Sequence, residues 1–454
     1  MTAPADPDNG GVTLSTSRFG RAIRISGLPV RALARTARIE FARLTGGDRA
    51  ALQRQARSAT AADTRRVLGE LKGGALKVGQ MLSTVDALLP QDPDGSWQVA
   101  LAALQQDNPA LAFDEVEPVL RRDLGSHWRS LFRDFDETTA AAASIGQVHR
   151  ATWADGTEVA VKIQYPGVAE AMAADVRSLS TALRVTSVVA RGVAMPPLIA
   201  ELRTRLGEEL DYRREGRHQA AFAREYRDDC EFVVPPVRLA TPRVLVSDWL
   251  SGEPFAAVAR TGNRHQRDRA GELYQRFFLT SPTRVGLLHT DPHPGNFRLL
   301  EDSRLGVLDF GSVLVTPGGL PDTFGGLIGA MLAGDPAAVE ARLRSDGFVA
   351  SGVSIEIEKL VDYLGPFTEP ARHEVFHYSR QWLREQFNRV NDPRNPDFSV
   401  ALRLNMPAEQ LFTHRVWLGL VGVLSGLDAT VVVRPELEAH LPGFAAAVAA
   451  GRPD

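Results

Sequence analysis

A short loop rich in proline places the strongest limit on how this chain of 454 residues folds. The segment Asp291-Pro-His-Pro-Gly-Asn296 follows an apolar run at Val285–Leu288. Two prolines and a glycine so close together exclude a continuous helix, so a shaped loop must present the polar side chains. The sequence Asp309-Phe-Gly311 then follows a second apolar strand, with Asp309 placed 18 residues after Asp291.

These groups, together with one lysine, are the parts that phosphoryl transfer requires. Such a site needs a cation for the α- and β-phosphates, oxygen ligands for magnesium, and a base near the acceptor. Val159-Ala-Val-Lys162 ends a strand, so Lys162 is placed to reach phosphates. Asn296 and Asp309 are the predicted magnesium ligands, and Asp291 is the predicted base. The step from Asp291 to Asn296 equals that of a kinase catalytic loop. We therefore predict binding of ATP with Mg²⁺.

Each motif also has a purely structural interpretation. A lysine in an alternating strand is more often an exposed edge residue, and the proline-rich loop can be a turn capped by Asn296. His293 suggests a metal ligand, but no second cluster has ligand spacing. Arginine carries most of the positive charge, because only four of the 52 Lys and Arg residues are lysines: Lys72, Lys77, Lys162 and Lys359. A lysine retained in this background favours a functional interpretation.

The segment expected to cover the phosphates departs from the usual glycine-rich pattern. Ala141, Ala142, Ala143 and Ser144 lie between the first two strands, where Gly-x-Gly-x-x-Gly is typical. Alanine restricts φ to negative values, so fewer backbone N–H groups can turn onto phosphates than in a glycine loop. A plain alanine-rich turn is the structural alternative.

A change of hydrophobic period divides the chain into segments. We predict a disordered N-terminus (1–17), a basic helical segment (18–66), a helical extension (67–128), a β-rich lobe (129–252) and a helical lobe with C-terminal helices (253–454). The β-rich lobe carries the expected strands Leu131–Asp136, Gly146–Trp153, Glu158–Gln164 and Arg243–Trp249. A small β-rich lobe followed by a large helical lobe predicts an α+β, protein-kinase-like two-lobe fold.

Composition and charge exclude several classes of protein. A net charge of −3 gives no reason to expect nucleic acid as a partner. Cys230 is the only cysteine, which excludes a disulfide within the chain and a cysteine-rich metal site. The longest apolar run, Val416–Leu427, is shorter than the about 20 residues of a membrane-spanning helix. We expect a buried core helix there and, without a secretory signal, a cytoplasmic location.

The segment 18–66 holds twelve arginines but only three acidic residues, Glu40, Asp48 and Asp63. One interpretation is a solvated helix docked on the core. Another is a basic amphipathic helix that lies on an anionic membrane, which would make the protein peripheral to that membrane. An organellar transit peptide, which is also rich in arginine and poor in acids, is a third.

Several segments together resemble the UbiB family, the aarF-domain-containing (ADCK) atypical kinases of coenzyme Q biosynthesis. The resemblance rests on the alanine-rich loop, Lys77-Val-Gly79-Gln80, Glu209-Leu-Asp211 and the Asp291–Asn296 loop. It extends from about Val67 to at least Leu424. It implies a kinase-like fold with an N-terminal helical extension that carries the Lys-x-Gly-Gln signature.

The resemblance also implies roles for individual residues. Lys162 looks like the phosphate-binding lysine, and Glu215 looks like its ion-pair partner on a helix. The nucleotide would also contact Ala141, Ala142, Ala143, Ser144, Asp248 and Leu250. The signature helix, with Lys77, Gly79 and Gln80, would fill the peptide site and present Lys77 to Glu209 and Asp211. Lys77 therefore joins Asp291 and Lys162 as a catalytic candidate.

Some positions depart from protein kinases. Thr290 replaces the arginine that pairs with a phosphorylated activation loop, and no Ala-Pro-Glu follows Asp309. The leading hypothesis is an atypical kinase or ATPase that supports isoprenoid-quinone or prenyl-lipid metabolism at a membrane surface. Its expected partners are ATP or ADP, an anionic membrane surface or prenyl lipid, and quinone-biosynthesis proteins. The alternatives are a small-molecule phosphotransferase and a nucleotide-gated scaffold without catalysis.

Overall fold

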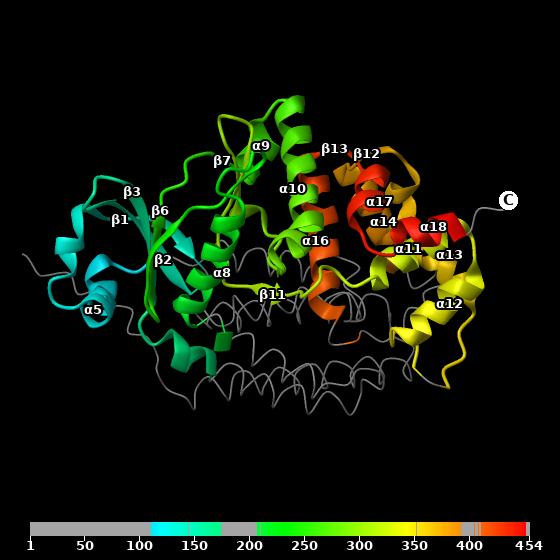
Figure 1. The fold of residues 1–454 in the computed structure, drawn as a ribbon, viewed down its shortest axis with the longest axis horizontal. Coiled ribbons are helices and arrows are strands. Elements are labelled where there is room, and N and C mark those ends of the chain that lie inside the picture. The colour runs from blue at the N-terminus through cyan, green and yellow to red at the C-terminus, as the bar shows by residue number, and fades with distance from the viewer. Residues whose placement is uncertain are drawn as a thin grey trace, which may run out of the picture.

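The computed structural model describes residues 110–143, 145–173, 207, 208, 210–350, 352–391, 404, 407 and 410–450. The β-rich lobe contains a five-stranded antiparallel sheet in the order β1-β2-β3-β6-β5 (Figure 1). Its strands are β1 (Phe132–Ala143), β2 (Gly146–Trp153), β3 (Glu158–Gln164), β5 (Val237–Ala240) and β6 (Val244–Asp248).

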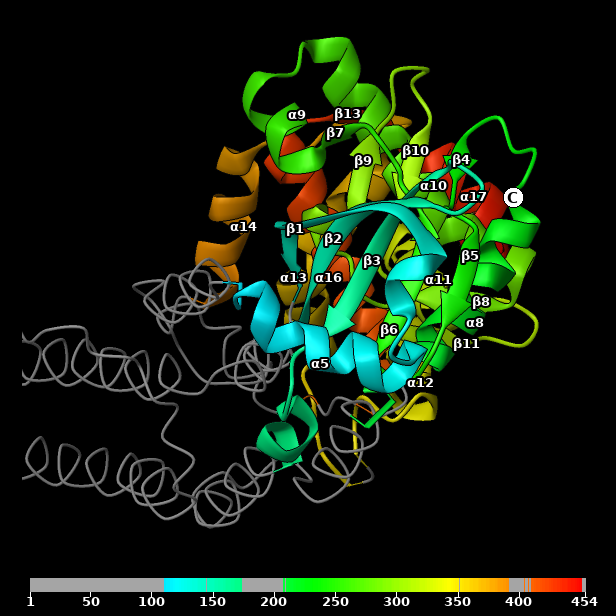
Figure 2. The same ribbon diagram turned by 90° about the vertical axis from the view of Figure 1, so that its left-hand side faces the viewer.

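The central strand β3 shows why Lys162 faces away from the core of this lobe. Val159, Val161 and Ile163 are fully buried in a cluster with the apolar side chains of α5 (Phe113–Leu124). Figure 2 shows α5 lying across this face of the sheet. Because successive side chains of a strand point to opposite faces, Lys162 emerges on the other side of the sheet.

Helix α8 (Tyr212–Glu225) packs on β5 and β6. A Cβ at Gly216 would lie 2.7 Å from the Cβ of Ala240, so glycine allows the helix to approach the strand closely. The helix begins at Asp211, whose side chain accepts a hydrogen bond from the N–H of Arg213. This N-cap satisfies a backbone donor that the first turn leaves open. Glu215 is therefore held in the first turn, next to the sheet.

The helical lobe is organised around α10 (Arg264–Val285), which lies beside α16 (Leu411–Leu427) and α9 (Phe255–Thr261) (Figure 1). A capping box between Asn263 and Gln266 begins α10. The core is aromatic, with Tyr274, Phe277 and Phe297 fully buried and packed against one another. This core carries the short strands that present the polar loops.

The remaining elements complete the helical lobe and its edges. One two-stranded sheet pairs β8 (Leu287–His289) with β11 (Val313–Val315), and another pairs β12 (Val375–His377) with β13 (Thr430–Val432). A four-stranded sheet has the order β4-β10-β9-β7, with β4 (Phe232–Val233), β10 (Leu305–Val307), β9 (Phe297–Leu299) and β7 (Glu253–Pro254). The other helices of this lobe are η2 (Pro294–Asn296), η3 (Glu369–Arg372), α11 (Thr323–Ala333), α12 (Pro336–Ser345), α13 (Ile357–Thr368), α14 (Arg380–Asn391), α17 (Arg434–His440) and α18 (Phe444–Ala450). The short helix η1 (Trp128–Leu131) instead belongs to the β-rich lobe, where it contacts β1 and α5.

The apolar run Val416–Leu427 is part of α16, with Val416, Leu420 and Leu424 buried in the core. The expectation of a core helix is therefore confirmed. Over the described part of the chain, no helix combines the length and the apolar character needed to cross a membrane.

The alanine-rich segment differs from the predicted loop. Ala141, Ala142 and Ala143 belong to β1, which extends beyond the expected end at Asp136 and pairs with β2 down to Gly146. An extended backbone satisfies alanine's preference for negative φ, so the ladder continues to the turn. The expected strands at 146–153, 158–164 and 243–249 agree with β2, β3 and β6. Strands β4, β5, β7, β8, β11, β12 and β13 were not predicted.

Candidate functional site

Lys162 is the link between the two lobes at the candidate site. Its Nζ donates to Oε1 of Glu215 at 2.7 Å and to Oδ2 of Asp309 at 3.3 Å. The side chains of Lys162 and Glu215 are 14% and 4% exposed, so this pair is largely shielded from solvent screening. Burial opposes the charged amine, but Asp309, Glu215 and Tyr212 together raise the pKa of Lys162 well above its ordinary value. Lys162 is therefore held as a cation.

The sheet fixes the position of that cation. Lys162 pairs with Val148 of β2 on one side and Leu245 of β6 on the other, so its strand is bonded along both edges. Its amine lies 5.1 Å from the centre of the Tyr212 ring. The paired strand β3, the capped first turn of α8 that holds Glu215, and the Tyr212 ring together restrict the Lys162 amine to the region between the lobes.

Asp309 adopts a left-handed backbone conformation, with φ at 58°. For a residue other than glycine this costs on the order of 1–3 kcal/mol, so neighbouring bonds must hold it. The carbonyl of Asp309 bonds to Nε2 of His289 at 2.7 Å, and its Oδ1 accepts from the N–H of Gly311 at 3.1 Å. The next residue, Phe310, is fully buried, with its ring centroid 4.9 Å from that of Phe222 in α8. The carboxylate is thereby directed toward Lys162.

His289 joins the two polar loops. Its Nδ1 accepts a hydrogen bond from the N–H of Asp291 at 3.3 Å, so Nε2 carries the proton that it donates to the carbonyl of Asp309. The imidazole is fully buried, and burial lowers the pKa of His289, although Asp291 and Asp309 act in the opposite direction. A neutral histidine thus fixes the spacing between the candidate base and a candidate metal ligand.

Asp291 is held by an amide and a guanidinium. Asn296 donates from Nδ2 to Oδ2 of Asp291 at 3.1 Å and to its carbonyl at 3.2 Å. Arg415 donates from Nη2 to Oδ1 of Asp291 at 2.8 Å. Because Asn296 uses its nitrogen here, its Oδ1 is the atom suited to a metal. One oriented amide oxygen and the Asp309 carboxylate are ligands that fit Mg²⁺, which prefers a few protein oxygens together with phosphates and water.

Arg415 was not predicted from the sequence. It lies on α16, 124 residues after Asp291 in the chain, and both side chains are about nine-tenths buried. The helix reaches the loop because a Cβ at Gly419 would lie 2.1 Å from Cγ of Pro292. Tyr274 of α10 donates to the carbonyl of Pro292 at 2.5 Å. The sequence did contain one signal for this contact: a charged residue inside an otherwise apolar helix. Such a residue is expected to have a partner, because a buried charge must be paired.

The other predicted residues lie at the edges of this centre or outside the described residues. Asp211 caps α8 and pairs with Arg213 at 2.9 Å. Asp248 ends β6 and pairs with Arg238, and Leu250 lies just beyond it. Ala141, Ala142 and Ala143 form the end of β1. Lys77, Gly79, Gln80, Ser144 and Glu209 lie outside the described residues.

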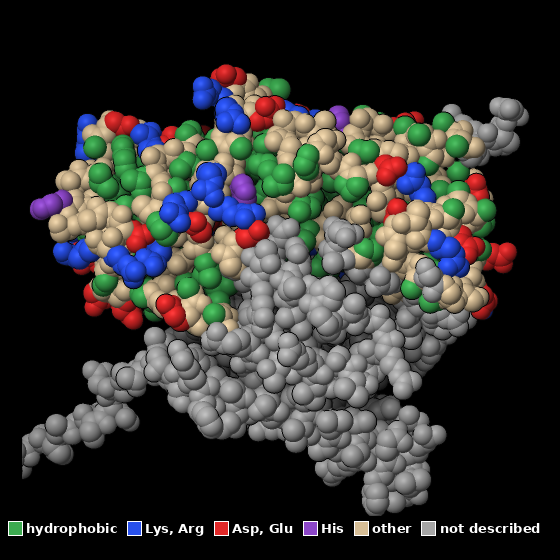
Figure 3. All heavy atoms as spheres, turned by 60° about the horizontal axis from the view of Figure 1, so that its bottom comes forward, with side chains coloured by type: hydrophobic (Ala, Val, Ile, Leu, Met, Phe, Trp, Pro, Cys, Tyr) green, Lys and Arg blue, Asp and Glu red, His purple; other side chains and the backbone are tan. Residues whose placement is uncertain are grey.

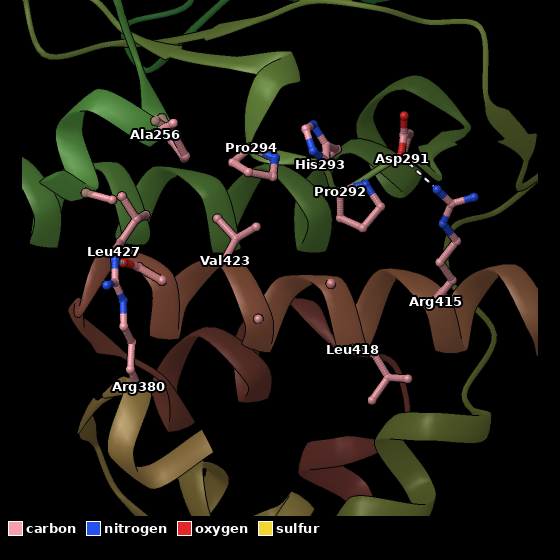
Figure 4. Close-up of a pocket in the computed structure, with 15 residues that line it drawn as sticks. Ala256, Asp291, Pro292, His293, Pro294, Arg380, Arg415, Leu418, Val423 and Leu427 are labelled. Atoms are coloured by element: carbon pink, nitrogen blue, oxygen red, sulfur yellow. Dashed lines mark hydrogen bonds and ion pairs between the residues drawn. The ribbon is translucent and has the colours of Figure 1, made fainter. Parts of the chain in front are cut away.

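A cavity of about 590 Å³ opens beside Asp291, between the Pro292–Pro294 loop and α16 (Figure 4). Its floor is formed by α16, with Gly419, Gly422 and Val423. This is a common size for a site that binds small molecules. The candidate base therefore adjoins this cavity, and Lys162 is not among the residues that line it.

Comparison with known proteins identifies the family. The ABC1 atypical kinase-like domain matches residues 103–340, and the chain belongs to this family. This confirms the resemblance to the UbiB and aarF-type kinases and the kinase-like fold inferred from the sequence.

Named relatives are atypical kinases. The chain is 30% identical over 376 residues to the mitochondrial atypical kinase coq-8 of Caenorhabditis elegans, which covers 80% of this chain and 48% of that protein. It is 31% identical over 374 residues to the mitochondrial atypical kinase COQ8B of Danio rerio, covering 80% and 58%. The chain thus spans about half the length of the curated relatives it matches.

A solved structure has the same fold. It is the complex of Rv3197 from Mycobacterium tuberculosis with erythromycin, which matches with a TM-score of 0.67 and 37% identity. The match covers 88% of this chain and 100% of that one.

Proposed function

We propose that this chain binds ATP with Mg²⁺ and catalyses transfer or hydrolysis of the γ-phosphate. The observation that carries the proposal is the contact of one buried lysine with Glu215 and Asp309, carboxylates from the two lobes. A cation positioned in this way binds the α- and β-phosphates in kinases. Family membership supports the same class of chemistry.

Each polar residue has a defined role in this proposal. Asp309 and Asn296 would hold Mg²⁺, which would neutralise charge on the phosphates. Glu215 holds the Lys162 amine in place, and Asp291 orients the attacking hydroxyl or water and accepts its proton. Arg415 keeps the Asp291 carboxylate in a fixed direction through its 2.8 Å bond. His289 sets the position of both loops without contacting substrate.

Phosphate release from ATP by the purified chain tests this function. Asp309→Asn should reduce the rate at least tenfold, a loss of about 1.4 kcal/mol of transition-state stabilisation. Asp302→Asn is the matched control, because Asp302 is exposed and bonds to Arg304 in a turn remote from Lys162. Equal activity in wild type and Asp309→Asn contradicts the proposal. Intact ATP binding without turnover under any condition supports the nucleotide-gated scaffold instead.

The cellular role proposed here is support of isoprenoid-quinone or prenyl-lipid metabolism at a membrane surface, by a cytoplasmic protein attached peripherally. It is supported by the similarity to relatives that are named mitochondrial COQ8 atypical kinases. On the face in Figure 3, Lys and Arg side chains of the described residues alternate with Asp and Glu rather than forming one broad basic area. We assign the proposed membrane contact to the arginine-rich segment 18–66, which lies outside the described residues.

ATPase measurements with liposomes test the membrane role. Anionic liposomes should stimulate phosphate release by the full chain, and removal of residues 1–62 should abolish the stimulation while leaving basal turnover. Equal stimulation with and without those residues contradicts the role of the arginine-rich segment.

Binding of a soluble small molecule is a second candidate function. The cavity beside Asp291 is the observation that favours it, and the related Rv3197 was solved with erythromycin. Calorimetric titration of erythromycin into the chain tests a shared ligand. Saturable binding with one site supports this candidate, and an absence of binding at the solubility limit excludes erythromycin as its ligand.

A further inference from the structure

The cavity beside Asp291 is an elongated groove whose lining changes along its length. Apolar side chains of Phe255, Leu418, Val423 and Leu427 line it, together with the prolines of the Asp291 loop. Arg415 and Arg380 lie at opposite ends (Figure 4). Leu418 remains 37% exposed, which is unusual for a leucine on a central helix and indicates an apolar surface left open.

Three glycines of α16 face the groove, and packing explains only one of them. Gly419 permits contact with Pro292, but a Cβ at Gly422 or Gly426 would meet no atom within 4 Å. Glycine within a helix is unfavourable relative to alanine. The chain therefore carries two unfavourable residues whose effect is to keep the groove open.

The Arg380 end of the groove offers an unneutralised positive charge. Arg380 begins α14, is exposed, and donates from Nη2 to the carbonyl of Gly426 at 3.0 Å. Among the described residues it has no acidic partner. A guanidinium has five N–H donors, so most remain available to a carboxylate.

The Arg415 end offers hydrogen bonds without net charge. Nη2 of Arg415 is paired with Asp291, while Nη1 is buried and has no hydrogen-bond partner among the described residues. A buried donor left unpaired is destabilising, so an oxygen atom placed there would be favourable. A second anion would lie beside the Asp291 carboxylate, so a neutral oxygen fits better than a charged one.

The geometry points to a binding site for an unbranched hydroxy acid: a carboxylate on Arg380, an apolar chain over Gly422, and a hydroxyl group at Arg415 and Asp291. The axis of α16 covers about 16 Å between Arg415 and Gly426 at 1.5 Å per residue. An extended chain of about ten to twelve carbons spans that length. Its hydroxyl end adjoins Asp291, the proposed base of the nucleotide centre. Binding of the hydroxy acid is measured without nucleotide, so it is tested independently of phosphoryl transfer.

Calorimetric titration of the full chain without nucleotide tests this site with three probes below their micelle concentrations. 12-Hydroxydodecanoate carries both end groups, dodecane-1,12-diol lacks the acid, and dodecanoate lacks the hydroxyl. The first should bind with one site and at least tenfold more tightly than either of the others. Equal affinity for all three, or no binding of 12-hydroxydodecanoate, overturns the proposal.

Two variants and a control locate the binding. Arg380→Gln should remove the preference for 12-hydroxydodecanoate over the diol, and Gly422→Leu should abolish binding because its side chain fills the groove. Gly365→Leu is the control, since Gly365 of α13 also has open space at its Cβ but lies outside the groove. Thermal unfolding establishes that Gly422→Leu is folded, and Gly426→Leu serves in its place if it is not. Retained binding in the folded groove-filling variant overturns the site.

Discussion

Nζ of Lys162 lies 2.7 Å from Oε1 of Glu215, although 53 residues separate them in the chain. Glu215 is 4% exposed, so its carboxylate must remain paired. Glu215→Gln should lower ATP affinity at least tenfold, because the amine can then turn fully toward Asp309. Loss of a charged hydrogen bond in this setting should also reduce the free energy of unfolding by about 1.5–3 kcal/mol.

Fluorescent-nucleotide titration and urea unfolding measure these two effects. Glu301→Gln is the control, because Glu301 is exposed in the turn after β9. Unchanged nucleotide affinity in Glu215→Gln would show that the ion pair does not organise the site.

The contact between α16 and the Asp291 loop predicts that replacing glycine by alanine has opposite effects on stability at Gly419 and at Gly422. Gly419→Ala places a methyl group 2.1 Å from Pro292 and should destabilise the fold by about 1–3 kcal/mol through overpacking. Gly422→Ala meets no atom and should stabilise the helix by up to about 1 kcal/mol. Urea unfolding of both variants measures the difference, and equal stabilities would contradict the close approach at Gly419.

Arg415 is predicted to position the base. Arg415→Ala should lower kcat for phosphate release at least tenfold with little change in KM for ATP, since the nucleotide contacts lie around Lys162. Arg415→Lys should restore part of kcat, because a lysine can still pair with Asp291. Steady-state kinetics of the three proteins separates this role from a structural one. A rise in KM without a change in kcat would indicate that Arg415 acts on nucleotide binding instead.

His414 predicts a dependence of stability on pH. Burial lowers the pKa of His414 to about 4 in the folded chain, below the ordinary value of about 6.5. Protonation therefore favours the unfolded chain, and stability should fall as pH drops from about 6.5 toward 4. His414→Gln should reduce that slope by up to about 1.4 kcal/mol per pH unit. Urea unfolding from pH 8 to 5 measures it, with pH 8 as the reference, and an unchanged slope would contradict burial of this imidazole.

The local parts of the site could be predicted from sequence, and the distant ones could not. Strand alternation and loop spacing are local properties, so they suffice to predict Lys162, Asp291 and Asn296 as candidates. In the structure Lys162 bonds to Asp309, and Asn296 bonds to Asp291. Arg415 was not predicted because its partner, Asp291, is 124 residues away in the chain. No local sequence pattern indicates a contact between residues so far apart. The short strands expected around Phe297–Leu300 and Arg304–Leu308 agree with β9 and β10. The strands β8 and β11 were not predicted, because three residues show no period of their own and the two strands pair with each other across a gap in the sequence.

The alanine-rich segment illustrates a second limit. A run of alanines has no hydrophobic alternation, so the sequence did not distinguish a loop from the continuation of a strand. Pairing of Ala142 with Gln147 decides the outcome, and Gln147 is itself held by Leu111, more than thirty residues away. Tertiary contacts thus determined that the alanines form a strand, because their own sequence favours neither a strand nor a loop.

Lys162, Asn296 and Asp309 are the residues proposed to bind ATP together with Mg²⁺. Calorimetric titration of ATP into the full chain, with Mg²⁺ and with EDTA, tests this proposal most directly. We expect one site per chain, with affinity at least tenfold higher when Mg²⁺ is present, and loss of that difference in Asp309→Asn. An absence of ATP binding, or binding of equal affinity with and without Mg²⁺, would contradict the proposal.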